Sequence, residues 1–479
     1  MSLITPGEGE VVPAGELGRV HFVAIGGAGM SGIARIMLRR GIAVSGSDAR
    51  DSDLLAHLAE LGAKVFVGHD AAHVGDADTV VVSTAIRDSN PELVAARERG
   101  LRVLHRSEAL AALMAGRRAV AVAGTHGKTT TTSMLTVALQ HAGADPSYCI
   151  GGQLVTTGLG ADEGTGEVFV AEADESDGSF LIYTPHIAVV TNVEADHLDN
   201  YGGFERVKEN FARFVERVEP GGTLVAGADD EVAMELAALA RDRGLPVLTY
   251  GEAAGADLRV SGFTPRGLGS RFAVEGVGEV TLGVPGRHNA LNAAAVIAVA
   301  RALGLDLATV RDGLAEFRGA MRRLEPKGEA AGVEVFDSYA HHPTELTADL
   351  SATRDYVREK AAGDTGREGR IVAVFQPHLY SRTRFFAAEF GAALGLADVA
   401  VVLDVYGARE DPEPGVTGRL VAERIPDGTT WEYVPEWDEV AAAVVRLAEP
   451  GDVVITLGAG DVTQLGPRIL AGLRAASSS

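Results

Sequence analysis

The sequence predicts an α/β protein with mostly parallel sheets, divided into three domains. Two observations lead to this fold class. The chain has 479 residues, and single domains usually contain roughly 100–200 residues. Short apolar runs typical of buried strands alternate with Ala- and Leu-rich runs typical of helices along the whole chain. Hydrophobic residues make up 46% and charged residues 23%, which is an ordinary balance for a globular protein.

The first domain is expected at residues 1–112. The run at 19–27 predicts a strand, 30–40 a helix and 43–48 a second strand. Further strands are expected at 79–86 and 102–106, with helices between them. A helix at 107–116 leads into the next domain.

The second domain is expected at residues 113–324. It begins with a strand, a loop and a helix in "RRAVAVAGTHGKT", and further strands are expected at 168–174 and 187–193. The segment 255–285 alternates around Gly turns and predicts a small antiparallel appendage. A helix follows at 286–304, and Asn289 signals its start.

The third domain is expected at residues 325–479. Four apolar runs, "VEVFDSYA", "RIVAVFQPH", "VAVVLDVYG" and "DVVITLGAGD", predict another parallel sheet.

Charge and composition exclude several classes of function. The formal net charge of −23 argues against sequence-independent binding to nucleic acid and against binding to anionic membrane surfaces. Cys149 is the only cysteine, which excludes an intramolecular disulfide and a cysteine-based metal cluster. The acidic start of the chain lacks the apolar segment of a signal peptide, and no apolar run reaches membrane-spanning length. We therefore expect a cytoplasmic protein without membrane insertion.

A first glycine-rich turn follows the first strand. Gly27, Gly29 and Gly32 match G-x-G-x-x-G, and Asp48 ends the next strand, at the distance expected for an acid that binds a ribose. Backbone N–H groups at a helix N-terminus bind anions, commonly a diphosphate. The pattern fits NAD or FAD, but UDP also carries a diphosphate and a ribose. A tight turn that simply needs glycine is the alternative.

A second glycine-rich turn, G-x-x-G-K-T at residues 124–129, is the stronger signal. It is shorter than the usual phosphate loop, because Val122 stands where that loop has its first glycine. Gly124 and Gly127 allow backbone amides to turn toward phosphate oxygens. Lys128 places an ammonium near the β- and γ-phosphates, and the hydroxyl of Thr129 can bind Mg²⁺. The alternative, a Thr-rich cap with a surface lysine, fits poorly with the apolar strand that precedes the loop.

Acidic residues follow two later strands of the same domain. Because the carboxyl ends of parallel strands meet at one edge of a sheet, these groups are expected to converge beside the phosphate loop. They favour a Mg²⁺ site there; the candidates are Glu172, Asp174, Glu175 and Asp177 after one strand and Asp196, His197 and Asp199 after the other.

Seven segments then resemble the Mur ligases in order: "HFVAIGGAGMSGIA", "AGTHGKTTTT", "EADESDGSFL", "TNVEADHLDNYG", "GRHNALNAAAV", "SYAHHPTE" and "FQPHLYSRTR". The resemblance extends from about residue 19 to about residue 465. It implies a Rossmann-like N-terminal domain for a UDP-sugar, a central P-loop-type ATPase domain and a Rossmann-like C-terminal domain for an amino acid. It also implies that ATP phosphorylates the carboxylate of UDP-N-acetylmuramate, and that the amine of L-alanine attacks the acyl phosphate.

The resemblance also implies roles for individual residues. The ATP-binding set is Gly124, Thr125, His126, Gly127, Lys128, Thr129, Thr130, Asn289, Arg323 and Asp337. Lys128, Glu172 and His197 are implied in catalysis, and Thr129, Glu172 and His197 would bind Mg²⁺, with two ions expected. The UDP-sugar candidates are Gly29, Met30, Ser31, Asp48, His69 and Ser83, and the amino-acid candidates are Tyr339, His341, His378 and Arg382.

Other functions remain open at this level. A sister ligase that attaches a preformed tripeptide to UDP-N-acetylmuramate would use the same motifs, although "GGQLVTTG" at 151–158 favours L-alanine as the acceptor. An NAD-dependent oxidoreductase would leave the second glycine-rich turn without a purpose. A non-catalytic nucleotide-binding regulator would be expected to lose Lys128 or Glu172, and both are present. Either a monomer or a homodimer is expected.

Overall fold

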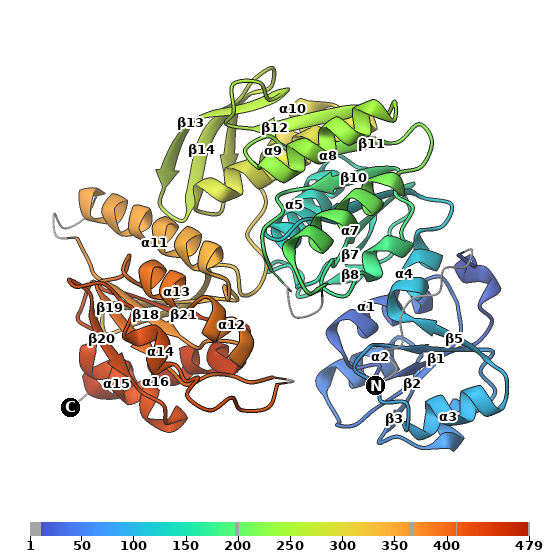
Figure 1. Cartoon of the computed structure of the whole chain (residues 1–479), viewed down its shortest axis with the longest axis horizontal. Coiled ribbons are helices and arrows are strands. Elements are labelled where there is room, and N and C mark those ends of the chain that lie inside the picture. Colours follow the sequence, from blue (N-terminus) through green and yellow to red (C-terminus); the bar gives the residue numbers. More distant parts are fainter. Residues whose placement is uncertain (1–10, 197–200, 364–367, 409, 478–479) are drawn as a thin grey trace. The chain divides into compact units, whose positions relative to one another are not determined.

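The computed structural model describes residues 11–196, 201–363, 368–408 and 410–477 (Figure 1). These residues form two compact units. The first unit runs to Val260 and also contains Val274–Val277 and Asn292–Glu316, and the second contains the remaining segments. Three sheets with helices between their strands confirm the predicted α/β class. The domain boundaries placed at 112 and 324 stay predictions.

The first sheet is parallel and has the strand order β3-β2-β1-β4-β5. Its strands are β1 (Val20–Val23), β2 (Val44–Asp48), β3 (Lys64–Val67), β4 (Thr79–Val82) and β5 (Arg102–His105). Its helices are α1 (Ala28–Arg39), α2 (Asp53–Glu60), α3 (Pro91–Glu98) and α4 (Arg106–Met114), with short helices η1 (Ala14–Glu16) and η2 (Ala71–Val74). The order reverses between β1 and β4, which is where such sheets bind ligands.

Two predicted strands of this sheet are shorter than expected. The strand expected at 19–27 ends at Val23, because Ala24 takes a positive φ of 62° and turns the chain toward α1. The strand expected at 79–86 ends at Val82.

The second sheet has ten strands in the order β15-β14-β13-β12-β11-β10-β6-β9-β7-β8. In chain order these are β6 (Arg118–Ala123), β7 (Ser147–Cys149), β8 (Ala161–Asp162), β9 (Val168–Glu172), β10 (Ile187–Val190), β11 (Thr223–Gly227), β12 (Val247–Gly251), β13 (Leu258–Arg266), β14 (Gly269–Val274) and β15 (Gly278–Leu282). Its helices are α5 (Lys128–His141), α7 (Phe204–Glu216), α8 (Glu231–Asp242), α9 (Arg287–Leu303) and α10 (Leu307–Leu314), with the short helix η3 (Ser179–Ile182).

Parallel pairing positions the functional edge of this sheet. The strand β6 lies between β9 and β10 and is parallel to both, with Val122 opposite Glu172 and Ala123 opposite Val190. Ala119–Ala123 are all buried, as a central strand of a parallel sheet requires. The carboxyl ends of β6, β9 and β10 therefore meet at one edge. The segment expected as a small antiparallel appendage forms β13, β14 and β15 at one end of this sheet, where β13 pairs in parallel with β12.

The third sheet has the order β16-β17-β21-β18-β19-β20 and is parallel except for β16. Its strands are β16 (Glu325–Ala330), β17 (Val333–Ser338), β18 (Ile371–Phe375), β19 (Val399–Val402), β20 (Thr430–Tyr433) and β21 (Val453–Leu457). Its helices are α11 (Pro343–Gly363), α12 (Tyr380–Phe385), α13 (Ala387–Leu394), α14 (Arg419–Ala422), α15 (Trp437–Leu447) and α16 (Leu465–Ser477), with the short helix η4 (Asp461–Gln464).

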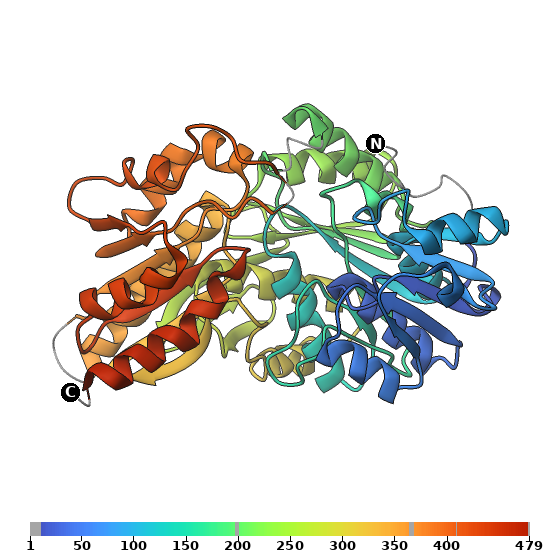
Figure 2. The ribbon, with the colours of Figure 1, turned by 90° about the horizontal axis from the view of Figure 1, so that it is seen from below.

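Both faces of the third sheet are covered by helices. Along β18, Ile371, Ala373 and Phe375 join one apolar cluster, whereas Val372 and Val374 join another. The first cluster includes residues of α11 and α13, and the second includes residues of α15 and α16, which Figure 2 shows in red on one face of the sheet. Alternate side chains of one strand thus enter two cores, as in a doubly wound sheet. Among the described helices, none is long and apolar enough to cross a membrane.

Candidate active site

The phosphate loop connects the buried strand β6 to helix α5, as predicted. Gly124 has a φ of 133°, and a Cβ atom there would lie 1.9 Å from Thr191 Oγ1. Gly127 has a φ of 86°, and a Cβ atom there would lie 2.6 Å from Asn292 Oδ1. Both positions therefore require glycine, for conformation and for space.

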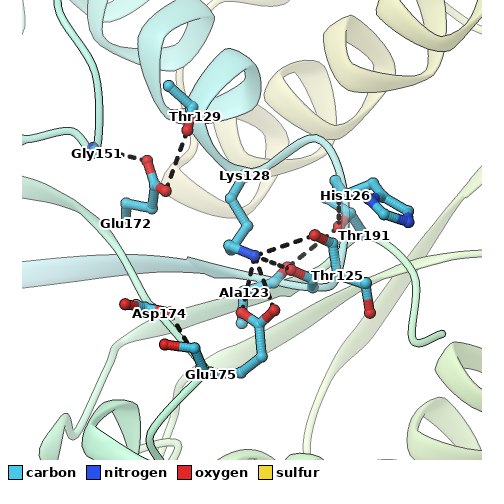
Figure 3. Close-up of polar contacts among 12 residues, drawn as sticks. Ala123, Thr125, His126, Lys128, Thr129, Gly151, Glu172, Asp174, Glu175 and Thr191 are labelled. Atoms are coloured by element: carbon cyan, nitrogen blue, oxygen red, sulfur yellow. Dashed lines mark hydrogen bonds and ion pairs between the residues drawn. The ribbon is translucent and has the colours of Figure 1, made fainter. Parts of the chain in front are cut away.

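The end of β10 sets the shape of this loop (Figure 3). The hydroxyl of Thr191 donates to the His126 carbonyl over 2.6 Å. The Asn192 amide donates to the same carbonyl over 3.1 Å and accepts from the His126 N–H over 2.9 Å. The Thr125 hydroxyl accepts from the Glu194 N–H over 2.8 Å. The loop is thus held open by side chains of a neighbouring strand.

Lys128 lies at the centre of the loop. Its ammonium donates to the carbonyls of Gly124 and Thr125 over 2.6 and 3.1 Å. It also forms an ion pair with Glu175, whose two carboxylate oxygens lie 2.9 and 2.8 Å away (Figure 3). The Lys128 side chain is 14% exposed and that of Glu175 is 4% exposed. The lysine is therefore not a surface cation, which rejects the alternative of a Thr-rich cap with an exposed lysine.

The surrounding charges keep Lys128 protonated. Burial alone lowers the pKa of an ammonium, but the carboxylates of Glu175 and Asp174 outweigh burial and raise the pKa of Lys128 above its usual value. Burial raises the pKa of Glu175 to about 7, against the opposing effect of Lys128. Lys128 is thus a protonated donor at neutral pH.

Glu172 and Thr129 form an oxygen-rich pair beside the lysine. The Thr129 hydroxyl donates to Glu172 Oε1 over 3.1 Å, and the Gly151 N–H donates to Glu172 Oε2 over 2.7 Å (Figure 3). A hydroxyl and a carboxylate at this distance match the hard oxygen ligands that Mg²⁺ prefers. The residues present therefore fit a magnesium ion. The third expected ligand, His197, lies outside the described residues.

The N-terminus of α5 is open toward the loop. Gly127 is its N-cap and provides no side-chain acceptor, so N–H groups of the first turn are available to an anion. The threonines that follow Lys128 differ in their contacts and burial. Thr132 donates to the Lys128 carbonyl over 2.8 Å, Thr131 is fully buried, and Thr130 is half-buried in the first turn. Thr129 alone contacts a candidate metal ligand of the neighbouring strand.

The first glycine-rich turn has a related geometry. Gly27 is the N-cap of α1 and also provides no side-chain acceptor. Asp48 Oδ2 accepts from the Gly26 N–H over 2.9 Å, so this acid holds the turn in addition to any ribose contact. Met30 is 3% exposed and packs in the core, and the N–H groups of Met30 and Ser31 donate to the Gly27 carbonyl. These backbone bonds belong to the first turn of α1, and the role of Met30 and Ser31 in binding a UDP-sugar stays a prediction.

Arg106, which the sequence reasoning missed, lies against the same turn. Its guanidinium donates to Asp174 over 3.2 Å and lies 3.9 Å from Asp177. A Cβ atom on Gly29 would be 3.7 Å from Arg106 Nη1. Burial lowers the pKa of Arg106, but nearby anionic groups outweigh burial and raise it. Its position directly after β5, at the carboxyl edge of a parallel strand, is the signal that could have identified it.

Two further UDP-sugar candidates follow strands of the first sheet. Ser83 comes directly after β4 and is half-buried, and its carbonyl accepts from the Ile86 N–H over 3.0 Å. His69 follows β3, and its Nδ1 lies 2.9 Å from Ser47 Oγ. Asp48, His69 and Ser83 thus share the carboxyl edge that carries the glycine-rich turn.

The second unit brings together three of the four amino-acid candidates. The rings of Tyr339 and His341 have centroids 5.1 Å apart, and those of His341 and His378 lie 5.9 Å apart. The guanidinium of Arg323 lies over the Tyr339 ring at 5.3 Å and 3.7 Å from a Glu345 oxygen. Arg382, the fourth candidate, is buried in α12.

The surroundings of Asp337 and Asn289 were not evident from the sequence. Asp337 is fully buried, and its oxygens accept from Thr456, Thr463 and Arg322 over 2.6, 2.8 and 3.2 Å. Its oxygens are thus held by neighbouring side chains, and the ATP-binding role of Asp337 stays a prediction. Asn289 lies inside the first turn of α9 rather than at its N-cap, because the helix begins at Arg287. Its amide donates to the Pro285 carbonyl over 2.6 Å.

Comparisons with known proteins give matches along almost the whole chain. Three family models match in succession: "Mur ligase family, catalytic domain" over residues 19–118, "Mur ligase middle domain" over 122–300 and "Mur ligase, glutamate ligase domain" over 322–460. With the phosphate loop, these matches define an ATP-dependent ligase that forms an amide bond. The chain belongs to the Mur ligase family.

Individual relatives resemble the chain over nearly its whole length. The UDP-N-acetylmuramate–L-alanine ligase of Thermobifida fusca is 61% identical, over 99% of this chain and 100% of that protein. The ligase of the same name from a Nocardioides species is 57% identical, over 96% and 97%. The crystal structure of the UDP-N-acetylmuramate–alanine ligase MurC from Thermotoga maritima is 31% identical, with a TM-score of 0.77, covering 96% of this chain and 100% of that one.

Proposed function

We propose that this protein joins L-alanine to the lactyl carboxylate of UDP-N-acetylmuramate, with ATP as co-substrate, in the synthesis of a peptidoglycan precursor. The substrates are inferred from the relatives, which carry the name of this activity at 52–61% identity. ATP as a co-substrate favours the cytoplasm as the site of the reaction. The protein would act as a monomer or a homodimer, without a nucleic-acid partner.

One observation carries the proposal at the level of the site. The ammonium of Lys128, whose side chain is 14% exposed, lies beside a contact between Thr129 of α5 and Glu172 of the neighbouring strand β9, next to the loop between β6 and α5. This arrangement binds a nucleotide's terminal phosphate and a divalent cation at one edge of a sheet. It has no role in an oxidoreductase, whose cofactor transfers hydride.

The chemistry explains why an amide-forming enzyme needs this loop. A carboxylate is a poor electrophile, so one of its oxygens first attacks the γ-phosphorus of ATP and ADP leaves. The amine of L-alanine then attacks the acyl carbon, and the tetrahedral intermediate loses inorganic phosphate and a proton. Lys128 neutralises charge on the transferred group. Thr129 and Glu172 would hold Mg²⁺, which shields the phosphate oxygens; His197 completes the proposed set for two ions.

The remaining candidates are assigned by position. Gly29, Asp48, His69 and Ser83 would bind the UDP-sugar at the carboxyl edge of the first sheet, and Arg106 provides positive charge beside that turn. Tyr339, His341, His378 and Arg382 would bind the amino acid. A guanidinium suits this task because its planar fork matches a carboxylate.

Phosphate release tests the proposal. Purified protein is expected to release phosphate from ATP only when Mg²⁺, UDP-N-acetylmuramate and L-alanine are all present. Undiminished phosphate release after omission of UDP-N-acetylmuramate or of L-alanine would contradict a ligase. Glycine, L-serine and the tripeptide should be compared with L-alanine in the same assay. Preference for the tripeptide would assign the sister activity, which the 30% identical Neisseria ligase for L-alanyl-γ-D-glutamyl-meso-diaminopimelate represents.

Lys128→Ala tests whether ATP and UDP-N-acetylmuramate bind at two independent sites. The variant is expected to lose phosphate release, because the loop loses its only ammonium, while binding of UDP-N-acetylmuramate in a calorimeter stays within about twofold. Lys360→Ala, at an exposed ion pair with Glu334, is the matched control and should leave both measurements unchanged. Loss of both in Lys128→Ala alone would show that the two glycine-rich turns do not serve separate ligands.

A further inference from the structure

A buried carboxylate in the first sheet takes no part in the chemistry described above. Glu92 lies in the first turn of α3 and has no exposed surface. Four polar side chains surround its oxygens: Ser47 Oγ at 2.6 Å, His73 Nδ1 at 3.2 Å, His69 Nδ1 at 3.3 Å and His21 Nε2 at 3.7 Å. The backbone N–H of Asp70 adds a fifth contact at 3.4 Å. A buried acid with so many donors is an organising centre rather than a surface charge.

Glu92 is ionised within this cluster. Burial alone would raise the pKa of its carboxyl, but the nearby His21 ring and the hydrogen bond from Ser47 outweigh burial and lower the pKa to about 2. An ionised carboxylate only accepts hydrogen bonds. Every polar group that touches Glu92 must therefore point a proton at it.

This requirement determines where the proton of Ser47 lies. The Ser47 hydroxyl has one hydrogen, and at 2.6 Å from Glu92 Oε2 it must donate there. Only lone pairs of Ser47 Oγ then remain to face His69 Nδ1, which lies 2.9 Å away. His69 Nδ1 must consequently carry a proton and donate. Glu92 Oε2, which lies 3.3 Å from His69 Nδ1, also requires a proton on that nitrogen because the carboxylate can only accept.

The other ring nitrogen of His69 becomes an acceptor. In a neutral imidazole only one nitrogen is protonated, so Nε2 presents a lone pair. The His69 side chain is 23% exposed, and among the described residues Nε2 has no hydrogen-bond partner. His69 follows β3, and the adjacent Gly68 N–H donates to the Asp48 carbonyl over 2.7 Å. The lone pair thus lies at the carboxyl edge that carries the glycine-rich turn and Asp48.

We propose that Glu92 and Ser47 are positioning residues that fix His69 as a hydrogen-bond acceptor for the N3–H of uracil, and thereby select uracil over cytosine. The inference rests on the proposed binding of a UDP-sugar in this domain. Uracil carries a hydrogen on N3, whereas cytosine has a lone pair there, which would face the lone pair of His69. A site built to receive an N–H rejects an analogue that lacks one.

The tautomer of His69 is measured directly by NMR. Long-range ¹H–¹⁵N correlation spectra of wild-type protein at pH 8, where an ordinary imidazole is neutral, distinguish protonated from bare ring nitrogens. The His69 signals are assigned by their loss in His69→Gln. The expected result is a protonated Nδ1 and a bare Nε2. A protonated Nε2 in wild-type protein overturns the proposal without any further variant.

Calorimetric titration with UDP and with CDP gives the second readout. Wild-type protein should bind UDP at least about tenfold more tightly than CDP. Glu92→Gln should reduce this ratio to about twofold or less and mix the two His69 tautomers, because a carboxamide no longer forces Ser47 to donate. Glu98→Gln is the matched control: it makes the same chemical change on the same helix, at an exposed position, and should change neither readout.

The outcomes distinguish failure of this inference from failure of the proposed function. Equal binding of UDP and CDP by wild-type protein overturns this inference and leaves the ligase assignment standing. Failure of wild-type protein to bind UDP or UDP-N-acetylmuramate overturns the proposed function and this inference with it. A folded Glu92→Gln protein with an unchanged UDP-to-CDP ratio also overturns the inference. If Glu92→Gln does not fold, the wild-type tautomer and the wild-type ratio decide.

Discussion

At the scale of single residues, Gly124 shows how closely the loop is fitted to its neighbours. Replacement with alanine would place a Cβ atom 1.9 Å from Thr191 Oγ1, at a φ of 133°. We expect Gly124→Ala to abolish phosphate release and to lower the free energy of unfolding by about 1–3 kcal/mol.

Gly143 is a control for Gly124, because it also has a positive φ, 73°, but a Cβ atom there would meet no other atom within 4 Å. Gly143→Ala is expected to cost about 1–2 kcal/mol of stability through backbone strain alone and to retain phosphate release. Activity in Gly124→Ala equal to that in Gly143→Ala would contradict the proposed role of the loop.

Glu175 predicts a dependence of stability on pH. Its pKa of about 7 in the folded protein exceeds its ordinary value of 4.5, so the folded state binds this proton more tightly than the unfolded state. Its contribution to the free energy of unfolding is greatest below pH 4.5 and decreases as pH rises to about 7. Glu175→Gln should remove this decrease, and urea denaturation between about pH 5 and 8 measures the difference. The exposed Glu167→Gln should follow wild type; identical pH dependence in wild type and Glu175→Gln would refute the assignment.

At the scale of elements, helix α5 explains why four threonines follow a lysine. The helix has no side-chain cap, which leaves its first N–H groups for an anion. Thr129 faces Glu172 of β9, while Thr132 and Thr136 donate to carbonyls one turn earlier. Threonine is a modest helix former, and the candidate site accounts for Thr129, whereas Thr132 and Thr136 bond to the helix backbone.

Thr129→Ala tests the role of the helix start in metal binding. Removal of the hydroxyl should raise the Mg²⁺ concentration that gives half-maximal phosphate release by about tenfold. Thr136→Ala, two turns further along the same helix, should leave this concentration unchanged. The measurement is a Mg²⁺ titration at saturating ATP. An unchanged requirement in Thr129→Ala would remove Thr129 from the set of metal ligands.

At the scale of the whole molecule, the alternation of strands and helices was predictable because apolar periodicity reports burial residue by residue. The three sheets and the placement of the phosphate loop between β6 and α5 agree with that pattern. Strand ends were less predictable, since Ala24 ends β1 by a local turn that its residue type does not signal. The Gly turns at 255–285 predicted a small antiparallel appendage, but not that its first strand, β13, would pair in parallel with β12, because that pairing depends on the whole sheet.

The fold class, the phosphate loop and the family could all be predicted from the chain's residues, because each depends on groups that lie close together in sequence. The sequence did not predict which acid pairs with Lys128. Glu175 forms that ion pair, whereas Glu172 contacts Thr129. Folding also brought Arg106 to Gly29 and enclosed Asp337 and Glu92. The physical reason is that ion pairing and burial depend on distances between strands far apart in sequence, which local patterns do not encode.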